Sequence, residues 1–359
     1  MIYLVGGTRP NFVKIAALSR AFKKYEIEFE IVHTGQHYDK NMDHVFFKEF
    51  ELDEPLVNFK VGSGPHGEQT GKIMGCFERL CFDARPDLVF TVGDVNSTMA
   101  VALVAAKMHI PVAHQEAGMR SGDKKMPEEI NRIVTDHVSD LLFPISPQDR
   151  RNLYNEGIDM EKIFLVGDPM IDNLLHYSRM ERELSTDEKH ILVEIHRPAN
   201  VDNEENLKNI IIALSQLSES FHVVFPMHPR TEKMINEFNL WGYMDMIDFT
   251  GPMGYFDFLK YMLHSHSIIT DSDGIQQETS ILDIPCVSIR DTTNIQYTVD
   301  YGTNTLVPPD INKIFAAATF PIYNKRQHTR FPHKLKELND GNASERIAEV
   351  IGGQKKFFI

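Results

Sequence analysis

The chain has 359 residues, of which 42% are hydrophobic and 25% are charged, and its formal net charge is -14 at pH 7. This length exceeds one typical domain core, so two domains are expected. The acidic balance argues against a general nucleic-acid binder, because such a protein needs a basic face.

The cysteines and the apolar runs indicate where the protein works. The three cysteines, Cys76, Cys81 and Cys286, form no CxxC pair, and an odd, sparse set fits a reducing compartment. The opening MIYLVGGTRP turns after a few apolar residues, which predicts a buried strand and not a signal peptide. No stretch approaches the roughly 20 apolar residues of a membrane helix. We therefore expect a cytoplasmic protein without a membrane partner.

The first half of the chain alternates short β-branched runs with helical patterns. The spacing predicts strands over residues 2–5, 29–33, 87–92, 111–114 and 141–144. It predicts helices over residues 10–23, 97–107 and 127–139. This run of βα units indicates a parallel sheet with helices on both faces.

A second series of the same kind begins near residue 170, with strands expected over residues 190–195, 223–226, 247–249, 267–270, 287–289 and 305–307. Two such halves predict an α/β fold of two Rossmann-like, doubly wound domains facing a cleft. A predicted strand at 163–166 gives way to a turn, which places the domains at 1–168 and 169–343. Residues 344–359 form a helical pattern that could cap either domain, and we expect it on the first.

A glycine loop, residues 6–10 (GGTRP), directly follows the first predicted strand. Glycines allow a tight turn, and the free amides of the following helix attract anions. Arg9 and Lys14 add two cations to the loop and the first turn. The loop is therefore either a site for an anionic ligand or an ordinary βα turn with solvated charges.

Acidic residues follow the next strands. Asp94 lies at the carboxyl end of a strand, where ligands bind in this fold, or it helps Asn96 or Ser97 to cap the next helix. Glu116 follows the apolar run PVAH and is either paired with Arg120 or poised for acid/base chemistry.

A helix that opens with Pro127 carries two further glutamates in its first turn, Glu128 and Glu129. Negative charge there stabilises a helix by about 0.3–1 kcal/mol, so a purely structural role remains open for both residues.

The second half places cations at two strand ends. His196 and Arg197 follow one strand and suit contact with a diphosphate, although they could also be solvated. His228 repeats the theme one βα unit later, before Pro229 and Arg230. These positions predict binding of a phosphorylated ligand.

The segment at residues 270–278 (TDSDGIQQE) combines a strand end, a small-residue turn and a helix start. The amides around Ser272 and Gly274 can bind phosphate, and Glu278, one helical turn later, can reach a ribose diol. The alternative is a capped helix in which Asp273 and Gln276 form a variant capping box. No histidine or cysteine cluster has metal-ligand spacing, so no metal site is predicted.

Taken together, these blocks resemble the non-hydrolysing UDP-N-acetylglucosamine 2-epimerase family over nearly the whole chain. The matching stretches are GTRPNFVKIAALSRAF, VGDVNSTMA, HQEAGMRSGD, MPEEINRIVTDH, VGDPMID, HRPAN, HPRT and DSDGIQQE. The resemblance implies a glycosyltransferase-B arrangement, with a UDP-sugar in the cleft and the nucleotide held mainly by the second domain. It also implies a homodimer and surface-polysaccharide precursor synthesis.

The resemblance also implies roles for single residues. The family's catalytic residues correspond to Asp94, Glu116, Glu128 and His196. Its cleft cations and its diphosphate and ribose ligands correspond to Arg9, Lys14, Ser272, Gly274 and Glu278. We add Arg120, Arg197 and His228 as candidates for substrate binding.

The implied reaction inverts C2 of the sugar. A carboxylate removes the C2 proton while UDP leaves C1, and a second group reprotonates the resulting glycal on its other face as UDP adds back. This chemistry needs two acid/base positions and cations for the leaving diphosphate. It needs no separate cofactor, and none is predicted.

The chain departs from the family pattern at four places. Asp273 replaces one of two glycines, Ala199 replaces the glutamate of His-Arg-x-Glu-Asn, residues 294–296 (NIQ) replace Glu-Arg-Pro, and Lys40 replaces the methionine of Gln-His-x-x-Met. Lys40 at the methionine position argues against allosteric activation by UDP-N-acetylglucosamine. The three second-domain departures indicate an altered sugar, such as a diacetamido or uronic-acid relative.

Three other functions are compatible with this fold. A hydrolysing 2-epimerase would release UDP and N-acetylmannosamine, and a glycosyltransferase would bind a separate acceptor. A nucleotide-sugar-binding regulatory protein would bind without turnover. We rank all three below the epimerase, because the first-domain carboxylates are complete.

Overall fold

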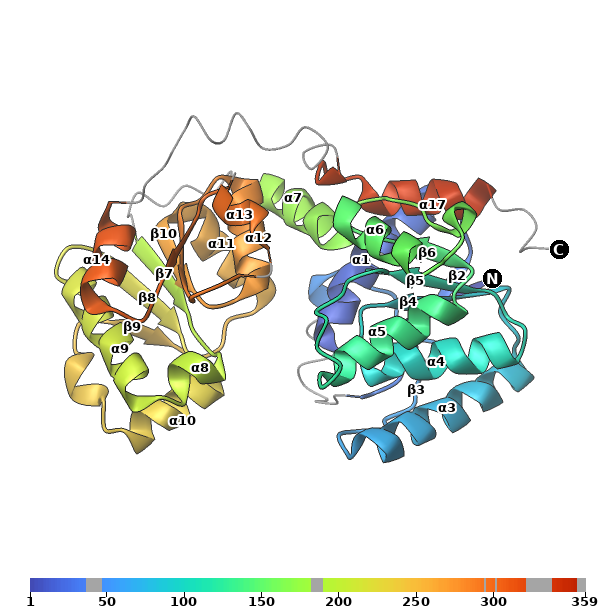
Figure 1. Ribbon diagram of the computed structural model, residues 1–359, viewed down its shortest axis with the longest axis horizontal. Coiled ribbons are helices and arrows are strands. Elements are labelled where there is room, and N and C mark those ends of the chain that lie inside the picture. Colours follow the sequence, from blue (N-terminus) through green and yellow to red (C-terminus); the bar gives the residue numbers. More distant parts are fainter. Residues whose placement is uncertain (37–46, 182–189, 294, 301, 321–337, 354–359) are drawn as a thin grey trace. The chain divides into compact units, whose positions relative to one another are not determined.

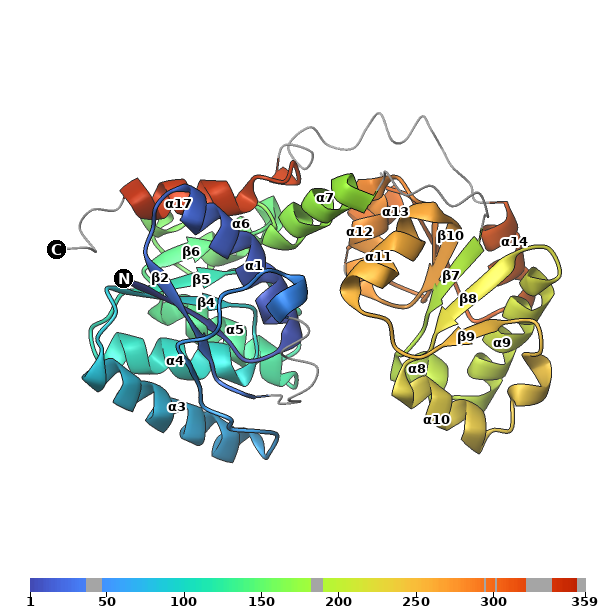
Figure 2. The same ribbon diagram turned by 180° about the vertical axis from the view of Figure 1, so that it is seen from behind.

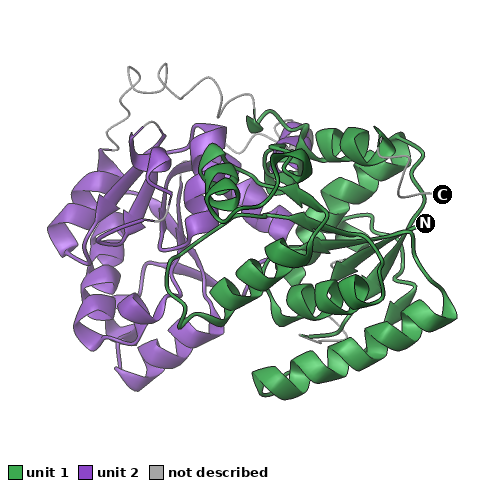
Figure 3. Cartoon of the chain, turned by 45° about the vertical axis from the view of Figure 1, so that its right-hand side comes forward, with its two compact units in different colours: residues 1–173, 337–359 green, residues 174–336 purple. Residues whose placement is uncertain are grey.

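The computed structural model describes residues 1–36, 47–181, 190–293, 295–300, 302–320 and 338–353. The chain divides into two compact units, unit 1 (Met1–Asn173 and Glu337–Ile359) and unit 2 (Leu174–Lys336), which Figure 3 shows in two colours. The predicted boundary lies five residues earlier, between 168 and 169. No helix among the described residues is long and apolar enough to cross a membrane.

Unit 1 contains, in its described part, a six-stranded parallel sheet in the order β3-β2-β1-β4-β5-β6. Its strands are β1 (Ile2–Gly6), β2 (Phe29–His33), β3 (Val57–Asn58), β4 (Leu88–Val92), β5 (Val112–Gln115) and β6 (Leu141–Phe143). The helices are α1 (Arg9–Lys24), α3 (His66–Asp83), α4 (Asn96–Lys107), α5 (Pro127–Val138), α6 (Pro147–Asn155) and α17 (Ala343–Gly353), and α7 (Pro169–Glu181) leads into unit 2. Figures 1 and 2 show helices on both faces of the sheet.

Unit 2 repeats this topology among its described residues, with a six-stranded parallel sheet in the order β12-β11-β10-β7-β8-β9. Its strands are β7 (His190–Glu194), β8 (His222–Pro226), β9 (Asp248–Thr250), β10 (Ser265–Thr270), β11 (Cys286–Ile289) and β12 (Asn304–Val307). Its helices are α8 (Pro198–Val201), α9 (Glu204–Ser218), α10 (Pro229–Glu237), α11 (Tyr255–His264), α12 (Asp273–Leu282), α13 (Tyr297–Asp300) and α14 (Ile311–Thr319).

The strand order locates the ligand edge of each sheet. Within each unit the chain runs outward from its first strand, then returns to the other side of that strand, which is the doubly wound order. Loops at the resulting switch point spread apart and leave room for ligands at the carboxyl ends of the strands. In unit 1 the switch point lies between β1 and β4, and in unit 2 it lies between β7 and β10.

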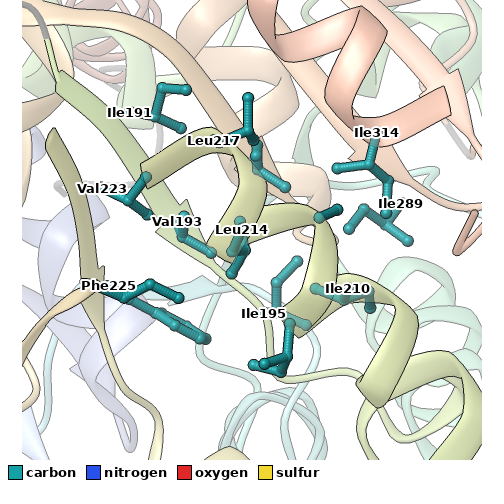
Figure 4. Close-up of a cluster of buried hydrophobic side chains, with 14 of the residues drawn as sticks. Ile191, Val193, Ile195, Ile210, Leu214, Leu217, Val223, Phe225, Ile289 and Ile314 are labelled. Atoms are coloured by element: carbon teal, nitrogen blue, oxygen red, sulfur yellow. The ribbon is translucent and has the colours of Figure 1, made fainter. Parts of the chain in front are cut away.

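Apolar residues from strands and helices fill both faces of each sheet. In unit 2, Ile191, Val193 and Phe225 on the strands pack against Leu214 and Leu217 on α9, as Figure 4 shows. All five are fully buried. The near-continuous apolar strands are what a parallel sheet covered on both faces requires.

The predicted α/β fold class is confirmed, but several elements differ from the prediction, among them α3, an 18-residue helix that was not predicted. The predicted strand at 163–166 is wrong, because only Ile163 makes a bridge, to Leu142. β3 was not predicted, since its two residues carry no periodic signal. In unit 1, α17 lies along α1, where Lys24 pairs with Glu345 at 2.7 Å.

Candidate active site

The start of α1 is fastened to the end of β4. The Asn11 side-chain oxygen accepts hydrogen bonds from the amides of Gly7 and Thr8, and its nitrogen donates to the Val92 carbonyl, each at 3.1 Å. A Cβ on Gly7 would lie 2.3 Å from the Ser97 hydroxyl, so only glycine fits there. Asn11 therefore holds the glycine loop beside the next loop of the switch point.

Glu116 and Lys14 form an ion pair at this edge. Their charged atoms lie 2.5 Å apart, and their side chains are 17% and 10% exposed. Burial alone would lower the pKa of Lys14, but the Glu116 carboxylate outweighs it and raises that pKa. Glu116 has φ of 70°, a left-handed conformation that non-glycine residues adopt under strain, often at functional sites. The predicted alternative of a Glu116–Arg120 pair is wrong.

Arg120 is engaged elsewhere. Its guanidinium contacts the Asp136 and Glu156 carboxylates, each at 2.7 Å, and only 11% of its side chain is exposed. Burial opposes the charged form, but these two carboxylates raise the pKa of Arg120. Arg120 therefore has two carboxylate partners within unit 1, and its predicted contact with substrate stays a prediction.

His114 and Asp136 form a buried centre beneath these loops. His114 Nδ1 lies 2.7 Å from Asp136, and Nε2 lies 2.9 Å from the Gly93 carbonyl. Since both ring nitrogens face acceptors, both donate and the ring is an imidazolium. Burial lowers the pKa of His114, but Asp136 raises it overall. Asp136 also accepts the Gly118 amide at 3.0 Å, so it joins the loops after β4 and β5.

Asp94 pairs with a helix-α5 arginine that the sequence analysis did not single out. Arg132 Nη1 lies 2.7 Å from the Asp94 carboxylate, and Asn131 donates to the Asp94 carbonyl at 2.9 Å. About a third of the Asp94 side chain, 34%, remains exposed. The predicted capping role is wrong for Asn96 and Ser97, because Val95 is the N-cap of α4.

Glu128 and Glu129, which the sequence could not distinguish, have different surroundings. Glu129 is buried and accepts the amides of Ser121 and Gly122 at 2.9 and 3.0 Å. Burial raises the pKa of Glu129, but these amides and Arg132 lower it to about 2. Glu129 is therefore a loop anchor, whereas Glu128 is half-buried in the first turn of α5.

Asp168 is a buried carboxyl group that the sequence analysis did not identify. It is 4% exposed, and its carboxylate accepts the Met170 amide at 2.9 Å at the start of α7. Burial and the nearby Glu116 charge raise the pKa of Asp168 to about 7, while Lys14 opposes them. A second carboxyl group therefore acts on the Lys14–Glu116 pair.

This raised pKa predicts a pH-dependent gain in stability for Asp168→Asn. The stabilising contribution of Asp168 is complete below its unfolded pKa of about 4 and is lost as pH rises through about 7. Asparagine cannot ionise and still caps a helix. At pH 8 we expect the variant to be more stable by about 1–2 kcal/mol, or roughly 3–6 °C in thermal melting. An equal difference at pH 4 and pH 8 would contradict this account.

In unit 2, Asp271 ties the end of β7 to the end of β10. It is fully buried and accepts the backbone amides of His196 and Arg197 at 3.1 and 3.0 Å. The side-chain amide of Asn200 donates to it at 2.9 Å. Because Asp271 directly precedes Ser272, the N-cap of α12, the His196–Arg197 backbone is held close to the start of that helix.

Asp273 binds two arginines at the start of α12. Its carboxylate pairs with Arg197 at 2.6 Å and with Arg290, which the sequence analysis did not single out. The predicted capping box is wrong, because Asp273 is the first helical residue and its carboxylate faces these guanidiniums. Two guanidinium groups therefore lie at a helix N-terminus, where anions bind.

The remaining predicted unit 2 residues occupy the same edge. His228 caps α10, with Nδ1 accepting the Arg230 amide at 3.1 Å, and its ring centre lies 5.6 Å from that of His196. Ser272 and Gly274 lie at the start of α12, and Glu278 follows one turn later. In unit 1, Arg9 is the first residue of α1. The candidate residues thus divide between the two units.

Among the described residues, one group has the spacing of metal ligands: Glu194, His196 and Asp271 offer atoms within 4.8 Å of one another. Each already has protein partners. Asp271 accepts two amides, and His196 Nδ1 lies 2.5 Å from Glu194. Hydrogen bonding within the protein therefore accounts for the group.

Two parallel, doubly wound sheets of the same strand order define a glycosyltransferase-B-like α/β protein. The family model described as UDP-N-acetylglucosamine 2-epimerase matches residues 20–352. The chain belongs to the UDP-N-acetylglucosamine 2-epimerase family, as its motifs predicted.

Relatives of known name agree with this assignment. A UDP-N-acetylglucosamine 2-epimerase of Methanocaldococcus jannaschii is 39% identical over 97% of this chain and 98% of its own. A UDP-2,3-diacetamido-2,3-dideoxy-D-glucuronate 2-epimerase of Pseudomonas aeruginosa is 36% identical over 98% and 99%. The solved M. jannaschii enzyme has a TM-score of 0.84 and 38% identity, and covers 98% of this chain and 99% of its own.

Proposed function

We propose that this protein inverts C2 of a UDP-N-acetylated sugar by eliminating UDP and adding it back. The observation that carries the proposal is the Lys14–Glu116 pair, in which a strained carboxylate lies at the ligand edge of the unit 1 sheet. The family assignment and the solved M. jannaschii UDP-GlcNAc 2-epimerase in complex with UDP-GlcNAc and UDP support it.

In the proposed reaction the unit 1 carboxylates act on the sugar. One carboxylate removes the C2 proton as the C1–O bond breaks. The electron pair of the C1–O bond leaves with UDP. A group on the other face then protonates C2. Glu116, Asp94 and Glu128 are the candidates for these two positions, which inversion requires. Lys14 and Arg132 hold Glu116 and Asp94 in place through ion pairs of 2.5 and 2.7 Å.

The unit 2 residues bind the nucleotide in this proposal. Arg197, Arg290 and the first amides of α12 take up the charge of the diphosphate as it leaves. Glu278 accepts the ribose hydroxyls, and His196 and His228 lie at the same edge.

Proton NMR with UDP-N-acetylglucosamine in deuterated water tests the proposal. We expect UDP-N-acetylmannosamine to form, with deuterium at C2 of both sugars. Free UDP with N-acetylmannosamine would instead show a hydrolysing enzyme. Absence of both products and of C2 exchange would contradict UDP-N-acetylglucosamine as the substrate.

A second candidate substrate is a UDP-diacetamido-uronate. Arg197 and Arg290 support it, because guanidinium groups bind carboxylates and a uronate brings one further carboxylate. The 36% identical P. aeruginosa enzyme is named for such a sugar. The ratio of kcat/KM for the two sugars decides between them.

We further propose a cytoplasmic homodimer that uses the outer face of α3. Gly67, Gly71 and Gly75 recur every four residues, and a Cβ on any of them would meet nothing within 4 Å. A recess of about 490 Å³ beside them is lined by Met74, Met99 and Ile130, among others. Ile130 is 49% exposed. Such small, open and apolar surface suits close contact with the same helix of a second copy.

Gly71→Arg tests this interface. The new side chain points into open space, so the monomer should fold, but a facing helix could no longer approach. We expect sedimentation to show the dimer mass for the wild type and mainly the monomer mass for the variant. Gly352→Arg, at an equally open position on α17, should keep the wild-type mass. An unchanged mass for Gly71→Arg would exclude this face.

A further inference from the structure

Glu194 and His196 form a hydrogen-bonded pair at the carboxyl end of β7. Glu194 Oε1 lies 2.5 Å from His196 Nδ1. The other carboxylate oxygen of Glu194 accepts the Thr270 hydroxyl of β10 at 3.0 Å. The glutamate is thus held from two strands at the switch point of unit 2.

The surroundings of His196 set its tautomer. Nδ1 lies 2.5 Å from Glu194 and 3.5 Å from Asp271, so Nδ1 carries a proton. Nε2 is on the opposite side of the ring, and 37% of the side chain is exposed. The pair therefore leaves Nε2 as the atom that can contact a ligand.

The charged groups around His196 act in opposite directions. The hydrogen bond to Glu194 raises the pKa of His196, burial lowers it, and Asp271 adds to the rise while Arg197 opposes it. His228 faces the ring from the loop after β8, and its own pKa is lowered by burial and by His196. The pKa of His196 is raised overall, which favours the imidazolium.

The sequence around the pair is also informative. Ala199 stands where the family motif has a glutamate, so this segment lacks that carboxylate. Glu194, the last residue of β7, supplies a carboxylate close to the same segment. Asp271 holds the His196 amide and directly precedes the N-cap of α12, where the diphosphate is proposed to bind.

We propose that Glu194 is a positioning residue that keeps His196 protonated at Nδ1 and directs its Nε2–H toward the departing diphosphate. This inference rests on the proposed function. As the C1–O bond breaks, the electron pair goes to the β-phosphate oxygen, and the imidazolium donates a hydrogen bond to that oxygen. The same contact is broken when UDP adds back to C1.

Histidine NMR titration of Glu194→Gln tests the pair without relying on turnover. Comparison of the wild-type spectrum with that of His196→Gln assigns the His196 signal. We expect Glu194→Gln to move the His196 midpoint to lower pH, because the carboxylate that favours the imidazolium is gone. Glu194→Asp should restore part of this change. Asp248→Asn is the matched control, since it breaks an exposed His222–Asp248 pair of 3.2 Å.

Turnover then tests the positioning role. If the imidazolium is the active form, activity falls as pH rises. In the Glu194→Gln variant this fall should begin at a lower pH than in the wild type. We expect kcat to drop about 10–100-fold at pH 8 with less than threefold change in KM.

An unmoved His196 midpoint would overturn the pairing. A moved midpoint with an unchanged pH profile would overturn the positioning role. If the wild type itself turned over no UDP-sugar, a moved midpoint would still support the pairing, and only the proposed function would fail.

Discussion

Replacing Glu116 by glutamine is expected to slow deuterium exchange at C2 by about 10²–10⁴-fold, the usual contribution of a general acid or base. Glutamine keeps the size of the side chain but cannot take up a proton. The Lys14 ammonium, 2.5 Å away, would also lose its counterion. NMR in deuterated water, with the substrate found for the wild type, measures the exchange rate.

Two further variants make this prediction specific. Glu68→Gln breaks the Glu68–Lys72 pair of 2.6 Å, which is exposed on α3, and should leave exchange unchanged. If Glu116→Gln folds poorly because Lys14 is left buried and unpaired, Glu116→Gln with Lys14→Met removes both charges and should fold. Exchange within threefold of the wild-type rate in a folded variant would remove Glu116 from the mechanism.

Replacing Asp136 by asparagine is expected to destabilise unit 1 by about 3–5 kcal/mol, the usual effect of removing one partner of a buried ion pair. Asp136 is 1% exposed and bonds to His114, Arg120 and the Gly118 amide. An amide has one acceptor oxygen and no charge, so the buried cations lose their partner. We expect the melting temperature of the unit to fall by roughly 10 °C.

The pH dependence of this loss has a definite sign. Burial raises the pKa of Asp136, but His114 and Arg120 lower it overall, so its stabilising contribution is lost as pH falls through the lowered value. The pKa of His114 is raised, so its contribution is complete below about pH 6.5 and is lost at higher pH. The difference between wild type and variant should therefore be largest between about pH 4 and 6.5.

Asp53→Asn is the control for the stability measurement. Asp53 pairs with Lys23 at 2.8 Å, but both side chains are at least half exposed, at 57% and 50%. Water and salt screen such a pair, so its loss should cost less than about 1 kcal/mol. Equal melting changes for Asp136→Asn and Asp53→Asn would show that the buried centre adds no special stability.

The repeated βα pattern could be predicted from the sequence, because it depends on the spacing of apolar residues that are neighbours in the chain. β2 (Phe29–His33) has the predicted bounds, β4 and β6 differ from prediction by one residue at one end, and β5 is shifted by one residue at both ends. The strand predicted at 163–166 is reduced to one bridge, from Ile163 to Leu142, although Phe164 and Val166 donate backbone hydrogen bonds to Leu142 and Pro144.

The candidate site could be predicted from the sequence only in part. The strand ends bearing Asp94, Glu116 and His196 could be located, because ligands bind at the carboxyl edge of parallel strands. The partner of Glu116 could not, since Lys14 lies 102 residues away in sequence. His114 gave a weaker signal, as a histidine inside an apolar strand requires a buried partner. Asp136 supplies it from α5, 22 residues later.

The sequence by itself determined the doubly wound architecture, the family and the loops that carry the polar residues. Only the tertiary structure decided how those residues pair: Lys14 with Glu116, Arg120 with Asp136, and Asp273 with Arg197 and Arg290. The physical reason is the distance along the chain between the residues that interact. Strands and helices follow from hydrophobic periodicity over neighbouring residues, whereas an ion pair forms only where the sheet brings separate loops within about 4 Å.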